Sequence, residues 1–216
     1  MTGREADGTP VGVAPDMVVA IAGRLCVPLT LVPFASPGAV ADAVAADAWD
    51  IALIAFEPER AETIAFAPPY VEIEATYLMP AGSPIRAIAE VDRPGVRIAI
   101  SARSAYGLYL SRNLSHAELC RAEGLPAPSR SSSSRGSTPW QGYVRPWIEN
   151  ADTLPGARVL DGRYSTVQQA VGTRPGNPTA LDFLTNVVTE ETQSGLVARL
   201  IERHGVTGRL MVAASA

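Results

Sequence analysis

The stretch WDIALIAF, residues 49–56, constrains the fold most, because it is almost continuously apolar. A strand of this composition is typical of a parallel sheet that is covered on both faces. LTLVPF (29–34) also predicts a strand, and the Ala- and Val-rich residues 39–48 between the two predict a helix. Strand, helix and strand in this order indicate a parallel βαβ unit, and therefore an α/β fold.

The same order of elements returns later in the chain. GVRIAIS (95–101) predicts a strand, residues 104–113 predict a helix, and HAELCRA (116–122) predicts a further strand. Residues 180–204 predict one or two amphipathic helices that end at Gly205, since glycine commonly follows a helix. The second half of the chain thus repeats the α/β pattern of the first.

Two extended segments divide this α/β chain. EATYLMP (74–80) and residues 165–173 predict strands that cross between two lobes. We therefore expect one lobe from residues 1–79 with 168–216 and a second lobe from residues 80–167.

Composition and motifs exclude several classes of protein. A formal net charge of −4 does not provide the basic face that nucleic-acid binding needs, and no apolar run is long enough to cross a membrane. The chain contains no P-loop, dinucleotide fingerprint or nucleophile elbow. His116 and Cys120 lie four residues apart but lack the further ligands that a metal ion requires. We expect no cofactor, no metal and no assignable catalytic residue.

The Ser-rich segment 128–146 differs from the rest of the chain. PSRSSSSRGSTPWQGYV (128–144) contains hardly any aliphatic side chain, whereas the flanking sequence is dense in Ala, Val, Ile and Leu. With GC-rich codons, reading STPWQGYV two bases later gives the string Asp-Ala-Leu-Ala-Gly-Leu-Arg, which resembles a helix-to-strand turn. This favours a displaced reading frame over a flexible insertion, and a flexible insertion over a binding arm.

WDIALIAFEPERAETIAFAPPYVEIEATYLMPAGSPI, residues 49–85, is the most informative part of the chain. It resembles the bacterial extracellular solute-binding proteins of family 3, the amino-acid-type substrate-binding proteins of ABC transporters. GTPVGVAPDM, SARSAYGLYL, STVQQAVGTRPGNP and ETQSGLVARLIERHGV resemble further segments of this family.

The resemblance implies a type 2 periplasmic-binding-protein-like fold, with two α/β lobes joined by two crossing strands and a ligand in the inter-lobe cleft. It also implies a small carboxylate-bearing ligand such as an amino acid, an ABC permease as partner, and a periplasmic or extracytoplasmic location. The N-terminal sequence MTGREADGTP lacks a signal-peptide pattern, which leaves a cytoplasmic location open.

The resemblance also assigns candidate ligand-binding residues by position. Arg60 takes the place of the arginine that binds the ligand carboxylate, a role that suits a planar, always-charged bidentate donor. Ser104 opens the second-lobe helix and is expected to contact the same carboxylate, although a helix N-cap without a ligand is the competing interpretation. Phe56 and Glu57 lie in the loop that contacts the ligand. Tyr70 lies on the Pro-Tyr turn and Gln168 lies on the return crossing, and both are further candidate ligand-binding residues.

Two departures from the family pattern predict an incomplete fold and impaired binding. The chain lacks the apolar strand and the aromatic-bearing loop with which the family normally begins. Residues 128–146 replace the segment that ordinarily supplies an acid for the ligand's amino group. We therefore expect free amino acids to bind weakly or not at all.

Three other functions compete with solute binding. A cyclohexadienyl-dehydratase-like lyase resembles the same fold and would need an acid such as Glu57, Glu72 or Glu74. A transcription-factor effector domain shares the architecture, but no helix-turn-helix region is present to support it. A non-functional remnant is the last alternative.

Overall fold

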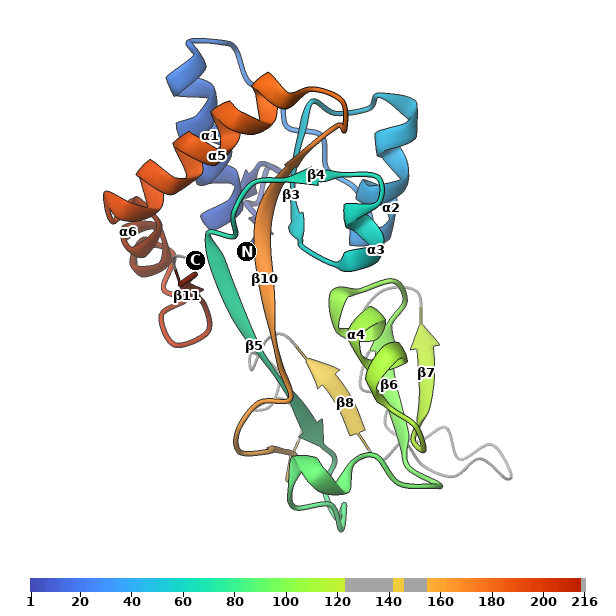
Figure 1. Ribbon diagram of the computed structural model, residues 1–216. Coiled ribbons are helices and arrows are strands. Elements are labelled where there is room, and N and C mark those ends of the chain that lie inside the picture. The colour runs from blue at the N-terminus through green and yellow to red at the C-terminus, as the bar shows by residue number, and fades with distance from the viewer. Residues whose placement is uncertain (123–141, 146–154, 215–216) are drawn as a thin grey trace. The chain divides into compact units, whose positions relative to one another are not determined.

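A computed structural model describes residues 1–122, 142–145 and 155–214, with only the backbone of residues 122 and 142–145. It has the mixed α/β character predicted from the sequence. The Ser-rich segment 128–146 lies outside the described residues, apart from the backbone of Gly142–Arg145. The chain forms two compact units: unit 1 is Met1–Ile73 with Gln168–Ala216, and unit 2 is Glu74–Val167. It leaves unit 1 within β5 (Val71–Met79) and returns within β10 (Ser165–Thr173) (Figure 1).

The strands of unit 1 pair antiparallel. β3 (Ile51–Ala55) runs against β10, with Ala55 opposite Gln169 and Ile51 opposite Thr173. β4 (Ala65–Phe66) pairs with the same strand at Gly172 and Thr173, and β11 (Met211–Val212) pairs with the start of β5. A short hairpin of β1 (Gly3–Arg4) and β2 (Pro10–Val11) precedes the first helix.

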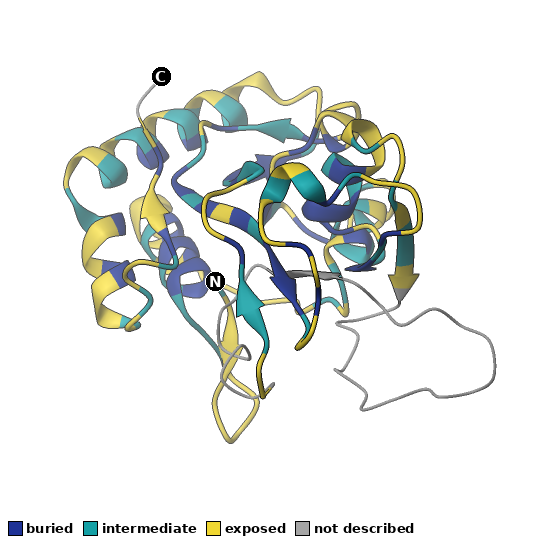
Figure 2. Ribbon diagram, turned by 90° about the horizontal axis from the view of Figure 1, so that it is seen from below, coloured by how far each residue is buried: buried dark blue, intermediate teal, exposed yellow. Residues whose placement is uncertain are grey.

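Helices α1 (Val13–Leu25), α5 (Pro178–Gln193) and α6 (Leu196–Arg203) pack against one another in unit 1 (Figure 1). They carry buried and exposed residues on the same turns, as amphipathic surface helices do (Figure 2). Side chains of α1 that face inward, such as Met17 and Ile21, are fully buried. The amphipathic pattern of residues 180–204 predicted α5 and α6.

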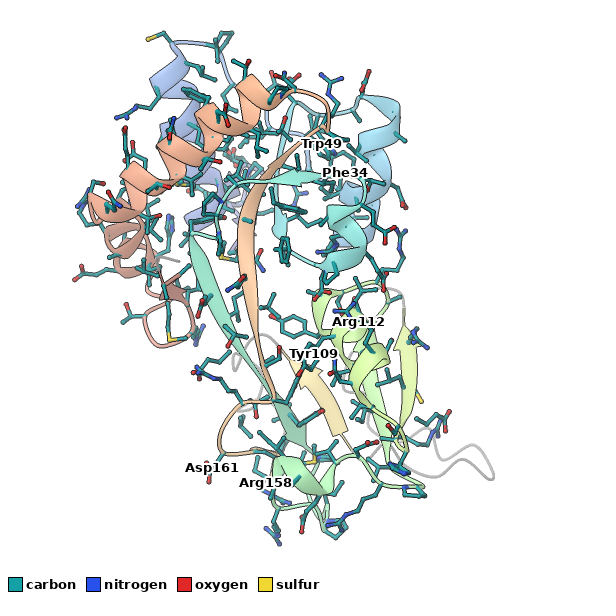
Figure 3. The ribbon with its side chains drawn as sticks, viewed as in Figure 1. Phe34, Trp49, Tyr109, Arg112, Arg158 and Asp161 are labelled. Carbon is teal, nitrogen blue, oxygen red and sulfur yellow. The ribbon has the colours of Figure 1, made fainter. Side chains whose placement is uncertain are left out.

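A second apolar cluster lies beside β3. Trp49, Ala52 and Ile54 are buried there with Ile64, and Phe34 packs against them (Figure 3). Residues of α2 (Pro37–Asp42) and of the 3-10 helix η1 (Ala43–Ala46) cover the cluster. The indole nitrogen of Trp49 donates to the carbonyl oxygen of Val40 at 2.9 Å, which ties the strand to α2.

The predicted strand at residues 29–34 is wrong, and so is the parallel βαβ unit built on it. Residues 27–34 belong to no strand, and Leu29, Leu31 and Val32 are exposed. Pro28 and Pro33 remove two of the N–H donors that a sheet ladder needs. Apolar composition was therefore not sufficient to predict a strand at residues 29–34, because a strand also requires a partner strand with matching backbone N–H and C=O groups.

Unit 2 contains the parallel arrangement that the second half of the sequence predicted. β6 (Arg97–Ser101) pairs in parallel with β7 (Glu118–Ala122), and α4 (Ala105–Asn113) connects them. β6 also pairs in parallel with β8 (Gly142–Arg145), while β8 and β9 (Arg158–Val159) lie antiparallel to β5. The 3-10 helix η2 (Ile88–Glu90) precedes β6. Within the described ranges, no helix has both the length and the apolar character that a membrane crossing needs.

The connection between α4 and β7 is fixed by one carboxylate. Asp92 accepts hydrogen bonds from the backbone N–H groups of Ser115, His116 and Ala117 at 2.7–3.2 Å. These bonds favour the ionised carboxylate and hold the pKa of Asp92 well below its usual range. Three successive N–H groups that lie outside the sheet ladder are satisfied in this way.

Candidate functional site

The turn that follows β3 places Arg60 close to the end of the strand. Glu57 is the N-cap of the one-turn helix α3 (Pro58–Ala61), and its carbonyl oxygen accepts from the N–H groups of Arg60 and Ala61 at 3.0 Å each. Pro58 occupies the first helical position, where its fixed φ favours the helix and its missing N–H is not needed. The EPER sequence therefore forms a tight turn directly after the strand.

The Arg60 side chain is anchored at the carboxyl end of β3. Its Nη1 donates to the carbonyl oxygen of Ala55 at 2.8 Å, and only 4% of the residue is exposed. A guanidinium remains charged in such a place, because its pKa is too high for deprotonation. A charge-assisted bond to a carboxylate is strongest where solvent is scarce.

Phe56, the residue after the strand, is 41% exposed. Its ring packs edge-to-face against Phe66 of β4, with ring centroids 5.4 Å apart and an interplanar angle of 76°. Its backbone N–H donates to the carbonyl oxygen of Gln168 at 2.8 Å. The ring is thus fixed on one side and open to solvent on the other.

Gln168 links this turn to β5. Its Nε2 donates to Oε1 of Glu72 at 3.4 Å, a long hydrogen bond between two half-buried side chains. Glu57 lies at the same end of β3 and is only 6% exposed. Unit 1 therefore brings Phe56, Glu57, Arg60 and Gln168 together at one end of β3, although Gln168 is more than a hundred residues away in sequence.

Tyr70 has the character of a packing residue. It is fully buried, its backbone N–H donates to the carbonyl oxygen of Gln169 at 2.9 Å, and burial raises the pKa of its phenol. Its hydroxyl makes no hydrogen bond within the described part of the chain. The structure thus describes Tyr70 as a residue of the core.

Ser104 belongs to unit 2, where it caps α4. Its hydroxyl accepts from the N–H of Gly107 at 3.1 Å and donates to the carbonyl oxygen of Ser101 at 2.8 Å. A hydroxyl has one proton, so this arrangement leaves none to donate to a ligand. In any α-helix the N–H groups of the first turn have no carbonyl partner within the helix. In α4 these include the N–H groups of Ala105 and Tyr106, which are the donors that a carboxylate would meet there.

We therefore expect Ser104→Ala to affect stability more than ligand affinity. Loss of an N-cap costs about 0.5–2 kcal/mol of the free energy of unfolding. Ser36 caps α2 in the same way, by accepting from Ala39 N at 3.2 Å, and Ser36→Ala is the matched control. Urea denaturation and calorimetric titration of both variants should show similar losses of stability and unchanged affinity. A loss of affinity in Ser104→Ala alone would assign its hydroxyl to the ligand.

Sequence reasoning did not single out Phe66, which supports the Phe56 ring. Its signal was the sequence TIAFAPPY, where an aromatic residue precedes the Pro-Pro-Tyr turn. Among the described residues, no three His, Cys, Asp or Glu side chains gather in the way that a metal site requires. The arrangement in unit 1 is instead suited to holding an anion by hydrogen bonds.

Comparisons with known proteins agree with this picture. The model of the family described as bacterial extracellular solute-binding proteins, family 3, matches residues 1–207. A search of curated proteins found no match. A mutant of ArgBP from T. maritima superposes with a TM-score of 0.75 at 19% identity, covering 94% of this chain and 89% of its own.

Two further structures are equally similar. The ancestral amino acid-binding protein AncCDT-1, a precursor of cyclohexadienyl dehydratase, has a TM-score of 0.75 at 20% identity and covers 94% of this chain and 89% of its own. A putative binding component of an ABC transporter from Wolinella succinogenes DSM 1740, complexed with lysine, has a TM-score of 0.75 at 17% identity, covering 94% and 90%. At these identities the likeness shows the fold, which is that of the type 2 periplasmic binding proteins.

Proposed function

Because the chain belongs to the bacterial extracellular solute-binding proteins, family 3, we propose that it binds a small carboxylate-bearing solute of the amino-acid type. Arg60 is the group that takes the carboxylate in this proposal. The observation that carries it is the anchored, nearly buried guanidinium at the carboxyl end of β3. A planar, always-charged guanidinium in a fixed position suits recognition of a carboxylate.

Groups within each unit, taken separately, support the same ligand class. In unit 1, Phe56 presents an exposed ring next to the Arg60 turn, and Gln168 lies beside Glu72. In unit 2, the first turn of α4 offers backbone N–H groups that favour an anion. Proteins of the same fold include a putative ABC-transporter binding component complexed with lysine and an ancestral arginine-binding protein bound to arginine.

The transport role follows from the family. In this proposal the protein acts outside the cytoplasm and delivers its solute to an ABC-type permease. It does not transform the solute. A lyase of the dehydratase type is the second candidate, because Glu57 is a nearly buried acid at the site and AncCDT-1 shares the fold.

Isothermal titration calorimetry with the common amino acids tests the proposal. The departure from the family pattern at residues 128–146 predicts weakened binding, so the titrations extend to millimolar concentrations. We expect heat of binding for at least one amino acid and no turnover of prephenate or arogenate, followed by ultraviolet absorbance. Absence of binding across the whole panel by the folded protein would refute the proposal, and turnover would favour the lyase.

A further inference from the structure

We infer that residues 25–32 form an interaction surface for a second copy of this chain, in which residues 29–32 of the two copies pair as antiparallel strands. The surface belongs to unit 1 and lies between α1 and α2 in the chain. The inference concerns association of the protein with itself and does not depend on the solute that it binds.

Exposed apolar side chains are concentrated in this short segment. Residues 23–33 are exposed without interruption. The described part of the chain has nine large apolar residues that are exposed, and five of them lie within eight consecutive positions: Leu25, Val27, Leu29, Leu31 and Val32. Single exposed apolar residues are ordinary on a protein surface, whereas a group of them marks an interaction site. A partner that covers residues 25–32 would remove all five side chains from water.

The backbone of the same segment is unpaired. Residues 29–32 belong to no helix or strand, and none of their N–H or carbonyl groups forms a hydrogen bond with another described residue. Free backbone groups beside apolar side chains are a template for pairing with another strand. Pro28 and Pro33 have no N–H to donate, so they limit the pairing to the four residues between them. This combination of groups fits an extended chain as the partner.

Charge narrows the choice of that extended chain. Residues 25–41 contain no charged side chain, although unit 1 has fourteen Asp and Glu residues against seven Arg. The segment therefore has no side chain of its own with which a basic or acidic peptide could form an ion pair. An uncharged, apolar strand matches it, and residues 29–32 of a second copy have this composition.

Antiparallel pairing makes the segment complementary to itself. A two-fold axis centred on Thr30 sets Leu29 of each copy opposite Leu31 of the other, and an axis centred on Leu31 sets the two Leu31 side chains opposite each other. Either register brings leucines into contact on one face of the pair. Such a contact closes at two copies, so the product is a dimer and not a filament. Because the interface is small, we expect a dissociation constant in the micromolar range.

Sedimentation velocity at increasing protein concentration tests the inference with two lysine substitutions. Leu31 and Met211 are both 37% exposed, and Met211 lies on β11, so Met211→Lys is the matched control for Leu31→Lys. Leu31→Lys should raise the dissociation constant of the dimer at least about ten-fold, because it sets like charges against each other in an apolar interface. Met211→Lys should leave it unchanged. Since each copy has a formal net charge of −4, added NaCl should strengthen the dimer.

Hydrogen exchange followed by mass spectrometry locates the contact in the unaltered protein. The amides of residues 29–32 should exchange fast in the monomer and more slowly as the dimer forms. A protein that stays monomeric at every concentration overturns the inference, and so does a dimer that leaves these amides unprotected, dissociates in NaCl or responds equally to both substitutions. Slow exchange already in the monomer also overturns it, because another part of the same chain then covers the segment. Circular dichroism establishes that each variant is folded, and the exchange experiment decides if Leu31→Lys is not.

Discussion

Arg60→Ala is expected to abolish amino-acid binding in calorimetric titrations. Truncating one partner of a buried, charged hydrogen bond costs about 2–5 kcal/mol, which corresponds to a loss of affinity of about 30-fold to several thousand-fold. The same substitution removes the donor to the Ala55 carbonyl oxygen, so the free energy of unfolding should also decrease. Both effects have one cause, the loss of a guanidinium that is fixed at the end of β3.

Two further variants separate the ligand role of Arg60 from its structural role. Arg60→Lys keeps the positive charge but lacks the planar fork, so we expect partial loss of affinity with a smaller loss of stability. Arg86→Ala removes an exposed arginine from unit 2 and should change neither the affinity nor the stability. If Arg60→Ala melts at a lower temperature but binds amino acids as tightly as the unaltered protein, Arg60 is a structural residue only.

Gly172→Ala is expected both to lower the stability of unit 1 and to disturb the candidate ligand site at the end of β3. A Cβ atom on Gly172 would stand 2.4 Å from Cγ2 of Ile64 and 3.2 Å from Cε1 of Phe66. Overpacking of this kind costs about 1–3 kcal/mol. Because Phe66 supports the ring of Phe56 beside the Arg60 turn, displacement of Phe66 should also weaken amino-acid binding.

Gly23→Ala is the matched control for this substitution. Gly23 lies within α1, and a Cβ atom there would meet nothing within 4 Å. Alanine at an unobstructed position in a helix stabilises by about 0.5–1 kcal/mol relative to glycine. Chemical denaturation followed by circular dichroism should therefore show a lower free energy of unfolding for Gly172→Ala and a higher one for Gly23→Ala. Equal effects would mean that β10 tolerates a side chain at Gly172.

The sequence located the individual elements well where local signals were strong. Ser104 with the apolar spacing of Tyr106 and Leu110 predicted α4, and the structure begins this helix at Ala105 with Ser104 as N-cap. The apolar run at residues 49–56 predicted β3, which spans Ile51–Ala55. Caps and apolar periodicity act within a few residues of the chain, so a local reading captures them.

Strand pairing could not be read in the same way. LTLVPF has the composition of a strand, yet residues 29–34 pair with no strand, and β3 runs antiparallel to a segment more than a hundred residues away. A strand is defined by its partner, and the choice of partner depends on which distant backbone groups the whole fold brings alongside.

In the candidate site, too, some features follow from the sequence and others only from the tertiary structure. By themselves, the residues of WDIALIAFEPER predicted a buried strand, the resemblance to solute-binding proteins and the place of Arg60 after that strand. Only the tertiary structure set Gln168 opposite Phe56 and gave the Phe56 ring its support from Phe66 over Gly172. The physical reason is that neighbouring residues determine local conformation, whereas contacts between distant segments depend on how the whole chain packs, where the space for a single Cβ atom decides which contact forms.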